Sequence, residues 1–78
     1  MKVYVVLYEF NILDESKQFV VCGVYDTEEK AQLKIQEMIP EIHENDYDEE
    51  ELNHNGYFAW NNYNGDFEYV HIIEQELK

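Results

Sequence analysis

The first two apolar stretches of the chain have the composition of β-strands. Residues 2–10, KVYVVLYEF, are rich in β-branched and aromatic side chains, and residues 18–25, QFVVCGVY, repeat that pattern. In residues 2–10 both sets of alternating positions are apolar, which predicts an interior strand that is at least partly covered on both faces. The polar segment NILDESK between the two stretches suits a hairpin loop. We therefore expect a β-hairpin over residues 2–25.

The segment that follows has helical periodicity. Its apolar positions recur at intervals of 4, 3 and 4 and would form one stripe against a sheet: Ala31, Ile35, Met38 and Ile42. Asp26 or Thr27 can cap this helix, and Asp26 with Glu29 has the spacing of a capping box. Pro40 lacks a backbone donor and clashes with the preceding turn, so we expect the helix to end or kink near Met38. Alternatively, Pro40 begins a second short helix.

A second hairpin is indicated near the end of the chain. Asn64-Gly65 lies between two strand-like runs and is the pair preferred in a type I′ turn. That turn would place Trp60 opposite Tyr69, which gathers the aromatic side chains on one face. The members of this face are Phe58, Trp60, Phe67, Tyr69, His71 and Ile73. We predict that this aromatic face is the core beneath the helix.

These elements define a single domain over residues 1–78. The order β-β-α-β-β predicts an α+β fold, with a four-stranded, mainly antiparallel sheet and one main helix packed on one face. Residues 40–55 are either helix or loop in this scheme. Because one helix covers only one face, the second sheet face needs another cover, which is either a homodimer or a partner protein.

The charge of the chain restricts its partners. The net charge is -13, arginine is absent, and residues 35–77 contain twelve acidic residues and no lysine. Such a field repels nucleic acid and anionic membranes and attracts basic surfaces. We therefore expect no direct nucleic-acid binding and no membrane association. The chain also lacks an apolar run of about 18 residues, so we expect no transmembrane helix. Cys22, the only cysteine, lies among valines, which fits a reducing cytoplasm.

Catalytic and metal-binding patterns are absent from the sequence. Within DYDEEELNHNGY, residues 46–57, an EF-hand loop would need glycine where Glu51 stands and glutamate where Tyr57 stands. Candidate transition-metal ligands are scattered without the spacing of a known site: Cys22, His43, His54 and His71. No nucleophile motif or glycine-rich phosphate loop is present. We therefore expect no enzyme activity, no cofactor and no metal site.

The spacing of the acidic residues indicates a binding surface instead. Five of them recur at intervals of 4, 3, 4 and 3: Glu37, Glu41, Glu44, Asp48 and Glu51. On a helix their Cβ atoms would be about 5 to 6 Å apart, which is similar to the spacing of phosphates along a nucleic-acid strand. The alternative is an ordinary solvated helix face. The predicted partner-binding residues are Glu37, Glu41, Glu44, Asp46, Tyr47, Asp48, Glu49, Glu50, Glu51 and Tyr57, the two tyrosines adding packing contacts.

Two resemblances accompany these patterns. The stretch MKVYVVLYEF…VVCGVYDTEEKA resembles the start of small phage and bacterial proteins that open with a strand hairpin and a T-E-E-K-A-type helix. The small, acidic, arginine-free and tyrosine-rich chain is similar to phage-encoded inhibitors that mimic nucleic acid, such as anti-CRISPR and anti-restriction proteins. This implies an inhibitor that occupies a basic nucleic-acid-binding surface in a host cytoplasm. The alternatives are an immunity protein against a basic nuclease toxin, and a homo-oligomeric assembly protein whose acidity only keeps it soluble.

Overall fold

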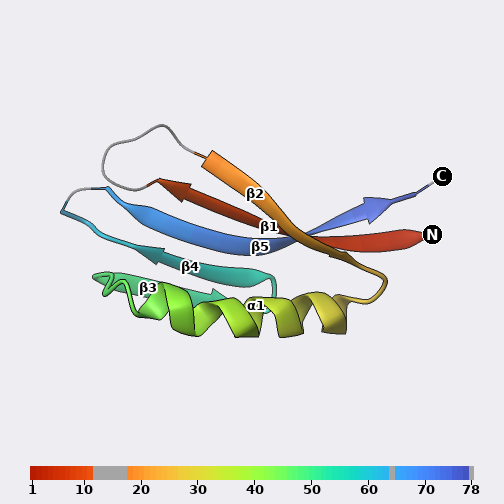
Figure 1. The fold of residues 1–78 in the computed structure, drawn as a ribbon, viewed down its shortest axis with the longest axis horizontal. Helices are drawn as coiled ribbons and strands as arrows, with labels where there is room; N and C mark the ends of the chain where they lie inside the picture. Colours follow the sequence, from red (N-terminus) through yellow and green to blue (C-terminus); the bar gives the residue numbers. More distant parts are fainter. Residues whose placement is uncertain (12–17, 64, 78) are drawn as a thin grey trace.

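The computed structural model describes residues 1–11, 18–63 and 65–77, which form one antiparallel sheet and one helix (Figure 1). The elements are β1 (Lys2–Asn11), β2 (Gln18–Tyr25), α1 (Glu28–His43), β3 (Glu49–Asn53), β4 (Gly56–Trp60) and β5 (Phe67–Glu76). The strand order in the sheet is β2-β1-β5-β4-β3. The predicted α+β class and the interior position of β1 are confirmed. The predicted number of strands is wrong, because the described residues form five.

The additional strand is β3, where the sequence left a choice between helix and loop. It pairs with β4, with Glu49 opposite Trp60 and Leu52 opposite Tyr57. A tight turn joins the two strands, in which the Asn53 side-chain oxygen accepts hydrogen bonds from the backbone N–H groups of residues 55 and 56 at 2.8 and 3.0 Å. Glutamate has a low β-propensity, so cross-strand pairing determines the conformation of this segment.

The start of α1 is fixed by Thr27, whose hydroxyl accepts a hydrogen bond from the backbone N–H of Lys30 at 3.2 Å. The predicted capping by Thr27 is thus confirmed. The alternative, a capping box based on Asp26, is wrong, since that carboxylate contacts the Lys30 ammonium at 2.8 Å. Glu28 and Glu29 occupy the first turn, where the helix dipole favours negative charge.

The predicted break near Met38 is wrong, because α1 continues through Pro40 to His43. Pro40 lies in the last turn of the helix. The backbone N–H of Glu44 still closes that turn by donating to the Pro40 carbonyl at 3.1 Å. Beyond the proline, Ile42 is buried in the core and stabilises the final turn.

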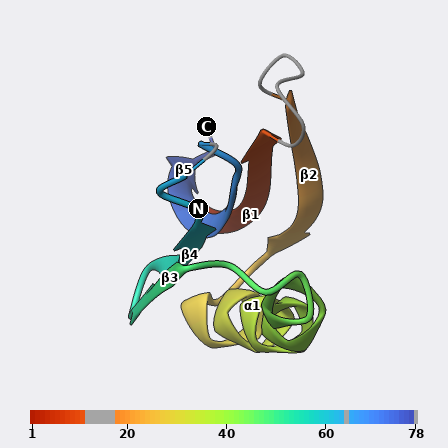
Figure 2. The ribbon, with the colours of Figure 1, turned by 90° about the vertical axis from the view of Figure 1, so that its left-hand side faces the viewer.

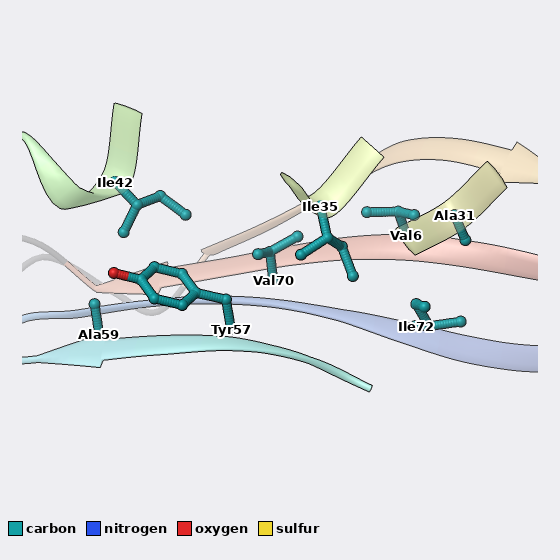
Figure 3. Close-up of a cluster of buried hydrophobic side chains, with 8 residues drawn as sticks. All are labelled: Val6, Ala31, Ile35, Ile42, Tyr57, Ala59, Val70 and Ile72. Atoms are coloured by element: carbon teal, nitrogen blue, oxygen red, sulfur yellow. The ribbon is translucent and has the colours of Figure 1, made fainter. Parts of the chain in front are cut away.

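The helix packs on the face of the sheet opposite to the predicted one. Figure 3 shows the apolar core, in which α1 residues lie over side chains of β1, β4 and β5: Val6, Ala31, Ile35, Ile42, Tyr57, Ala59, Val70 and Ile72. The predicted helix stripe is therefore confirmed, whereas the prediction that the aromatic face is the core is wrong. Ala31 and Ala59 are fully buried in this core, where their small side chains leave room for the larger ones around them.

The β4–β5 connection is longer than the predicted two-residue turn. Trp60 pairs with Phe67 and Phe58 with Tyr69, which shifts the predicted register by two residues. The backbone N–H of Asn61 donates to the Asp66 carbonyl at 2.8 Å, and Gly65 has a φ of 77°. Asn64 of the predicted type I′ turn lies outside the described residues. An even shift leaves every side chain on its predicted side of the sheet, so the aromatic side chains still share one face.

The sheet has one covered and one open face. Figure 2 shows α1 against one face, with β2 and β3 at opposite edges of the sheet. The two termini lie at one end of the molecule, and the C-terminal end of α1 and the start of β3 lie at the other (Figure 1). Within the described part of the chain, no helix is long and apolar enough to cross a membrane.

Candidate functional site

Strand β3 divides the predicted acidic run between the two faces of the sheet. Successive side chains of a strand point to opposite faces, so Glu49 and Glu51 share one face and Glu50 the other. Glu49 and Glu51 pair across the ladder with Trp60 and Phe58, on the open face. Glu50 lies on the helix side. The three glutamates are therefore in two different environments, and only Glu49 and Glu51 lie on the open face.

An aromatic cluster occupies the open face beside these two glutamates; its members are Phe58, Trp60, Phe67, Tyr69 and His71. The Phe58 ring centroid lies 4.8 Å from Trp60, 5.8 Å from Phe67 and 5.2 Å from Tyr69. Tyr69 stacks on His71 at 4.2 Å. The Trp60 indole N–H donates to the Asn62 side-chain oxygen at 3.1 Å. These contacts hold the rings in place, so the cluster offers flat apolar surface at low entropic cost.

The open face continues as aliphatic surface on β1 and β2. Val5 pairs with Val24 and Leu7 with Val21 across this ladder, and both β2 side chains are exposed. Between the aromatic and aliphatic parts, the His71 Nε2 atom lies 3.0 Å from the Glu9 carboxylate. The face thus runs from the glutamates of β3, through the aromatic cluster, to an uncharged edge at β2.

The acidic end of the molecule has little compensating charge. Residues 41–68 contain nine acidic residues and neither lysine nor arginine. Within the described part of the chain, the lysines form their ion pairs elsewhere: Lys2 with Glu74, Lys30 with Asp26 and Lys34 with Glu37. Glu49 and Glu51 form no ion pair with another described residue. Their carboxylates are therefore open to a cation from another molecule.

Glu50 has a different role, because it joins β3 to the end of α1. Its carboxylate lies 2.6 Å from the His43 Nδ1 atom and accepts a hydrogen bond from the Tyr57 hydroxyl. The Tyr57 hydrogen bond and then the His43 contact hold the pKa of Glu50 below its ordinary value. Glu50 in turn raises the pKa of His43. This arrangement stabilises the charged carboxylate and ties three elements together.

Glu68 forms a second carboxylate cluster between the sheet and the loop after α1. The side chain is buried and accepts hydrogen bonds from the Tyr8 hydroxyl, from the Tyr47 hydroxyl at 2.6 Å and from the Asn45 amide at 2.6 Å. Burial, followed by the hydrogen bond to Glu68, raises the pKa of both tyrosines. The sequence does not reveal this cluster, because its members are far apart along the chain.

The two tyrosines of the predicted partner surface make hydrogen bonds within the fold. Tyr57 is only 4 % exposed and lies in the core. Tyr47 is partly buried and its hydroxyl points to Glu68. Phe58, Trp60 and Phe67, which the sequence predicts to be core residues, are instead partly exposed on the open face. No sequence signal distinguishes the two faces, since both carry apolar residues.

The predicted helical row of five carboxylates does not form. Glu37 and Glu41 lie on α1, Glu44 caps its C-terminal end, Asp48 lies in the following loop and Glu51 lies on β3. The Asp48 carboxylate accepts a hydrogen bond from the backbone N–H of Asn62 at 3.2 Å, which holds this loop against the β4–β5 connection. Asp46 adopts a positive φ of 57° in the same loop. The phosphate-like spacing therefore ends with the helix, and the acids beyond it are exposed on a loop and a strand.

A groove lies between α1 and the β3–β4 turn, with a cavity volume of about 470 Å³. Ile35 and Leu52 line it, and the Gln32 amide donates to the His54 carbonyl at 3.1 Å. Its lining contains no carboxylate, thiol or hydroxyl group. Among the described residues, no group of three potential ligands could hold a metal ion. The ionisable side chain in this lining is His54.

Known proteins give no guide to the function. No family model, no curated protein and no solved structure matches the chain. The candidate site is therefore defined by geometry and charge: the aromatic cluster on the open face with Glu49 and Glu51 beside it.

Proposed function

We propose that the protein is a small acidic binding protein that occupies a basic nucleic-acid-binding surface of a host or defence protein. It acts by blocking that surface, in the manner of a phage-type inhibitor. The observation that carries this proposal is the pairing of Glu49 with Trp60 and of Glu51 with Phe58 on the open face. Each pair sets a carboxylate beside an aromatic ring.

The chemistry of these pairs favours arginine and lysine side chains. A guanidinium group binds a carboxylate through two hydrogen bonds and also stacks on an aromatic face. Trp60 is the aromatic residue that attracts cations most strongly. Surfaces that bind nucleic acid present such cations in number, because they contact phosphates. The open face can therefore replace both the phosphates and the bases that such a surface normally contacts.

The acidic end supports the proposal through long-range electrostatics. Nine acidic residues without lysine or arginine in residues 41–68 attract a basic partner and raise the association rate. The contact itself involves the strand and the open face, so a helix that imitates a phosphate row is not required. The remaining acids on α1 and its loop (Glu37, Glu41, Glu44, Asp46 and Asp48) act through their field.

A pull-down at two salt concentrations tests this function. The tagged protein is incubated with extracts of defence-carrying cells at about 0.1 M and about 1 M salt, where the Debye length falls from about 10 Å to about 3 Å. We expect a basic nucleic-acid-binding protein at low salt only, and its loss when Glu49 and Glu51 are both replaced by glutamine. Recovery of nothing but the protein itself at both salt concentrations would exclude the proposal.

The uncovered apolar face favours a second candidate, a homo-oligomeric assembly protein whose acidity only keeps it soluble.

An immunity protein that neutralises a basic nuclease would use the same acidic surface as the inhibitor. The identity of the protein recovered in the pull-down distinguishes the immunity protein from the inhibitor. If it is a nuclease whose activity is lost in the complex, the immunity function is correct.

A further inference from the structure

The two edges of the sheet differ in how they are protected against pairing with another strand. Exposed edges in natural sheets are short, or they carry charged residues, proline or bulges. β3 has five residues, of which three are glutamates. β2 has eight residues, QFVVCGVY, with no acidic or basic side chain and no proline. β3 is therefore protected by charge, and β2 is not.

The side chains of β2 are apolar and exposed on both faces of the sheet. Phe19, Val20, Val21 and Val24 are between 49 % and 68 % exposed. Val21 and Val24 share the open face with Leu7 and Val5, their partners on β1, while Val20 pairs with Tyr8 on the helix side. A strand added beside β2 would cover apolar groups on both faces as well as satisfy the outer backbone groups.

Among the described residues, a β-bulge interrupts this edge. The register changes between Val6 and Leu7, which pair with Gly23 and Val21, so Cys22 has no partner in the ladder. The bulge interrupts β2 after residue 21. Residues 18–21 before it pair regularly with β1 and form the most regular part of the open edge.

We propose that two copies of this chain pair antiparallel through residues 18–21 of β2, which joins their sheets into one. The charge distribution identifies the second copy as the occupant. At a net charge of -13, two copies repel each other unless they meet away from the acids. In the strand order β2-β1-β5-β4-β3, β2 is the edge farthest from the glutamates of β3. The strand itself offers a basic partner no ion pair, whereas two-fold pairing matches the same apolar strand with itself.

The dimer goes beyond the proposed function and does not depend on it. It keeps both acidic edges at the outer ends of the joined sheet, so each dimer presents two binding surfaces for a basic partner. The two associations respond oppositely to salt. Salt screens the repulsion between copies and strengthens the dimer, while it weakens a complex held by opposite charges.

Sedimentation equilibrium over a range of protein and salt concentrations tests the proposal. We expect a dimer that tightens as salt increases, and a dissociation constant at least tenfold higher for Val21→Lys. Val20→Lys, on the other face of the same strand, should have the same effect. Leu52→Lys is the matched control, because it adds the same charge at a residue that is 66 % exposed on β3, and it should leave the dimer unchanged.

Two further measurements make the outcome decisive. Circular dichroism checks that the lysine variants remain folded, and hydrogen exchange shows whether residues 18–21 become protected as the dimer forms. A wild-type protein that stays monomeric at every concentration would overturn the proposal. A dimer that tolerates both β2 variants but is weakened by Leu52→Lys would also overturn it, as would an edge that binds an extended peptide and never a second copy.

Discussion

Glu49 lies opposite Trp60 across the β3–β4 ladder, on the sheet face that α1 leaves open. This pairing places an acidic residue beside an aromatic surface. The acidity is evident from the sequence, whereas the exposure of the aromatic surface is not. The pairing also separates Glu49 and Glu51, which face outward, from Glu50, which is bound to His43 and Tyr57. The difference between neighbouring glutamates gives each a distinct experimental signature.

The first prediction concerns the outward-facing glutamates. Replacing Glu49 and Glu51 together by glutamine should raise the dissociation constant for a basic partner about tenfold, which corresponds to about 1.4 kcal/mol of binding free energy. The folded state should be retained, because neither carboxylate is paired with another described residue and their mutual repulsion is removed. Isothermal titration calorimetry measures the affinity, and urea denaturation measures the stability. The opposite pattern, lower stability with unchanged affinity, would contradict the assignment of these residues to the contact.

The second prediction concerns pH and the pair of His43 and Glu50. His43 has a pKa raised above 6.5, so its contribution is complete below that pH and is lost as pH rises through the raised value. Glu50 has a pKa lowered below 4.5, so its contribution is complete above that pH and is lost as pH falls through the lowered value. The pair therefore stabilises the fold most between these two ordinary pKa values.

Urea denaturation of the wild type and His43→Gln measures this window. The difference in unfolding free energy should be largest between pH 4.5 and 6.5, the two ordinary values, and should decline at higher pH. An NMR titration of the His43 ring should give a pKa above 6.5 that falls towards that value in Glu50→Gln. A difference that is constant across pH would show that the pair does not form.

The third prediction concerns the buried carboxylate of Glu68. Glu68→Ala should reduce the unfolding free energy by about 3 kcal/mol, because the donors on Tyr8, Tyr47 and Asn45 lose their acceptor. The control is Glu74→Ala, which removes an exposed ion pair with Lys2 and should change stability by less than about 1 kcal/mol. Equal effects in urea denaturation would mean that the cluster adds no stability.

The fourth prediction concerns two glycines in different environments. A Cβ atom at Gly56 would lie 2.3 Å from the backbone oxygen of Val70, so Gly56→Ala must displace β4 from β5. We expect a loss of about 3 kcal/mol or more. At Gly65 a Cβ atom meets nothing within 4 Å, and the positive φ alone should cost about 1 kcal/mol. Thermal denaturation of both alanine variants tests this order, which would be wrong if Gly65→Ala were the less stable.

Several elements could be predicted because their local signals are strong. Residues 2–10 and 18–25 are rich in β-branched side chains, and the apolar stripe of the helix recurs at the helical period. The alternation of strand side chains also predicts which aromatic residues share a face. An error of two residues in the hairpin register preserves that grouping.

Other elements depend on contacts that the sequence does not display. β3 contains three glutamates and forms a strand through pairing with β4. The burial of Ile42 beyond Pro40 keeps the last helical turn in place. The choice of covered face cannot be read from hydrophobicity, because both faces are apolar, and it decides whether Trp60 is core or surface. For this reason the candidate site was only partly predicted: its glutamates were found and its aromatic rings were not.

Competition between the protein and nucleic acid for a captured partner tests whether the acidic and aromatic face occupies a nucleic-acid-binding surface. The tagged protein is used for a pull-down at about 0.1 M salt, and duplex DNA or RNA is then added in increasing amounts. We expect a basic protein to be recovered and to be displaced by nucleic acid. We also expect the double variant Glu49→Gln/Glu51→Gln to fail to recover this protein, and Val20→Lys, on the helix side of β2, to recover it. If nucleic acid displaces nothing, or if the double variant captures as well as the wild type, the acidic and aromatic face does not occupy a nucleic-acid-binding surface.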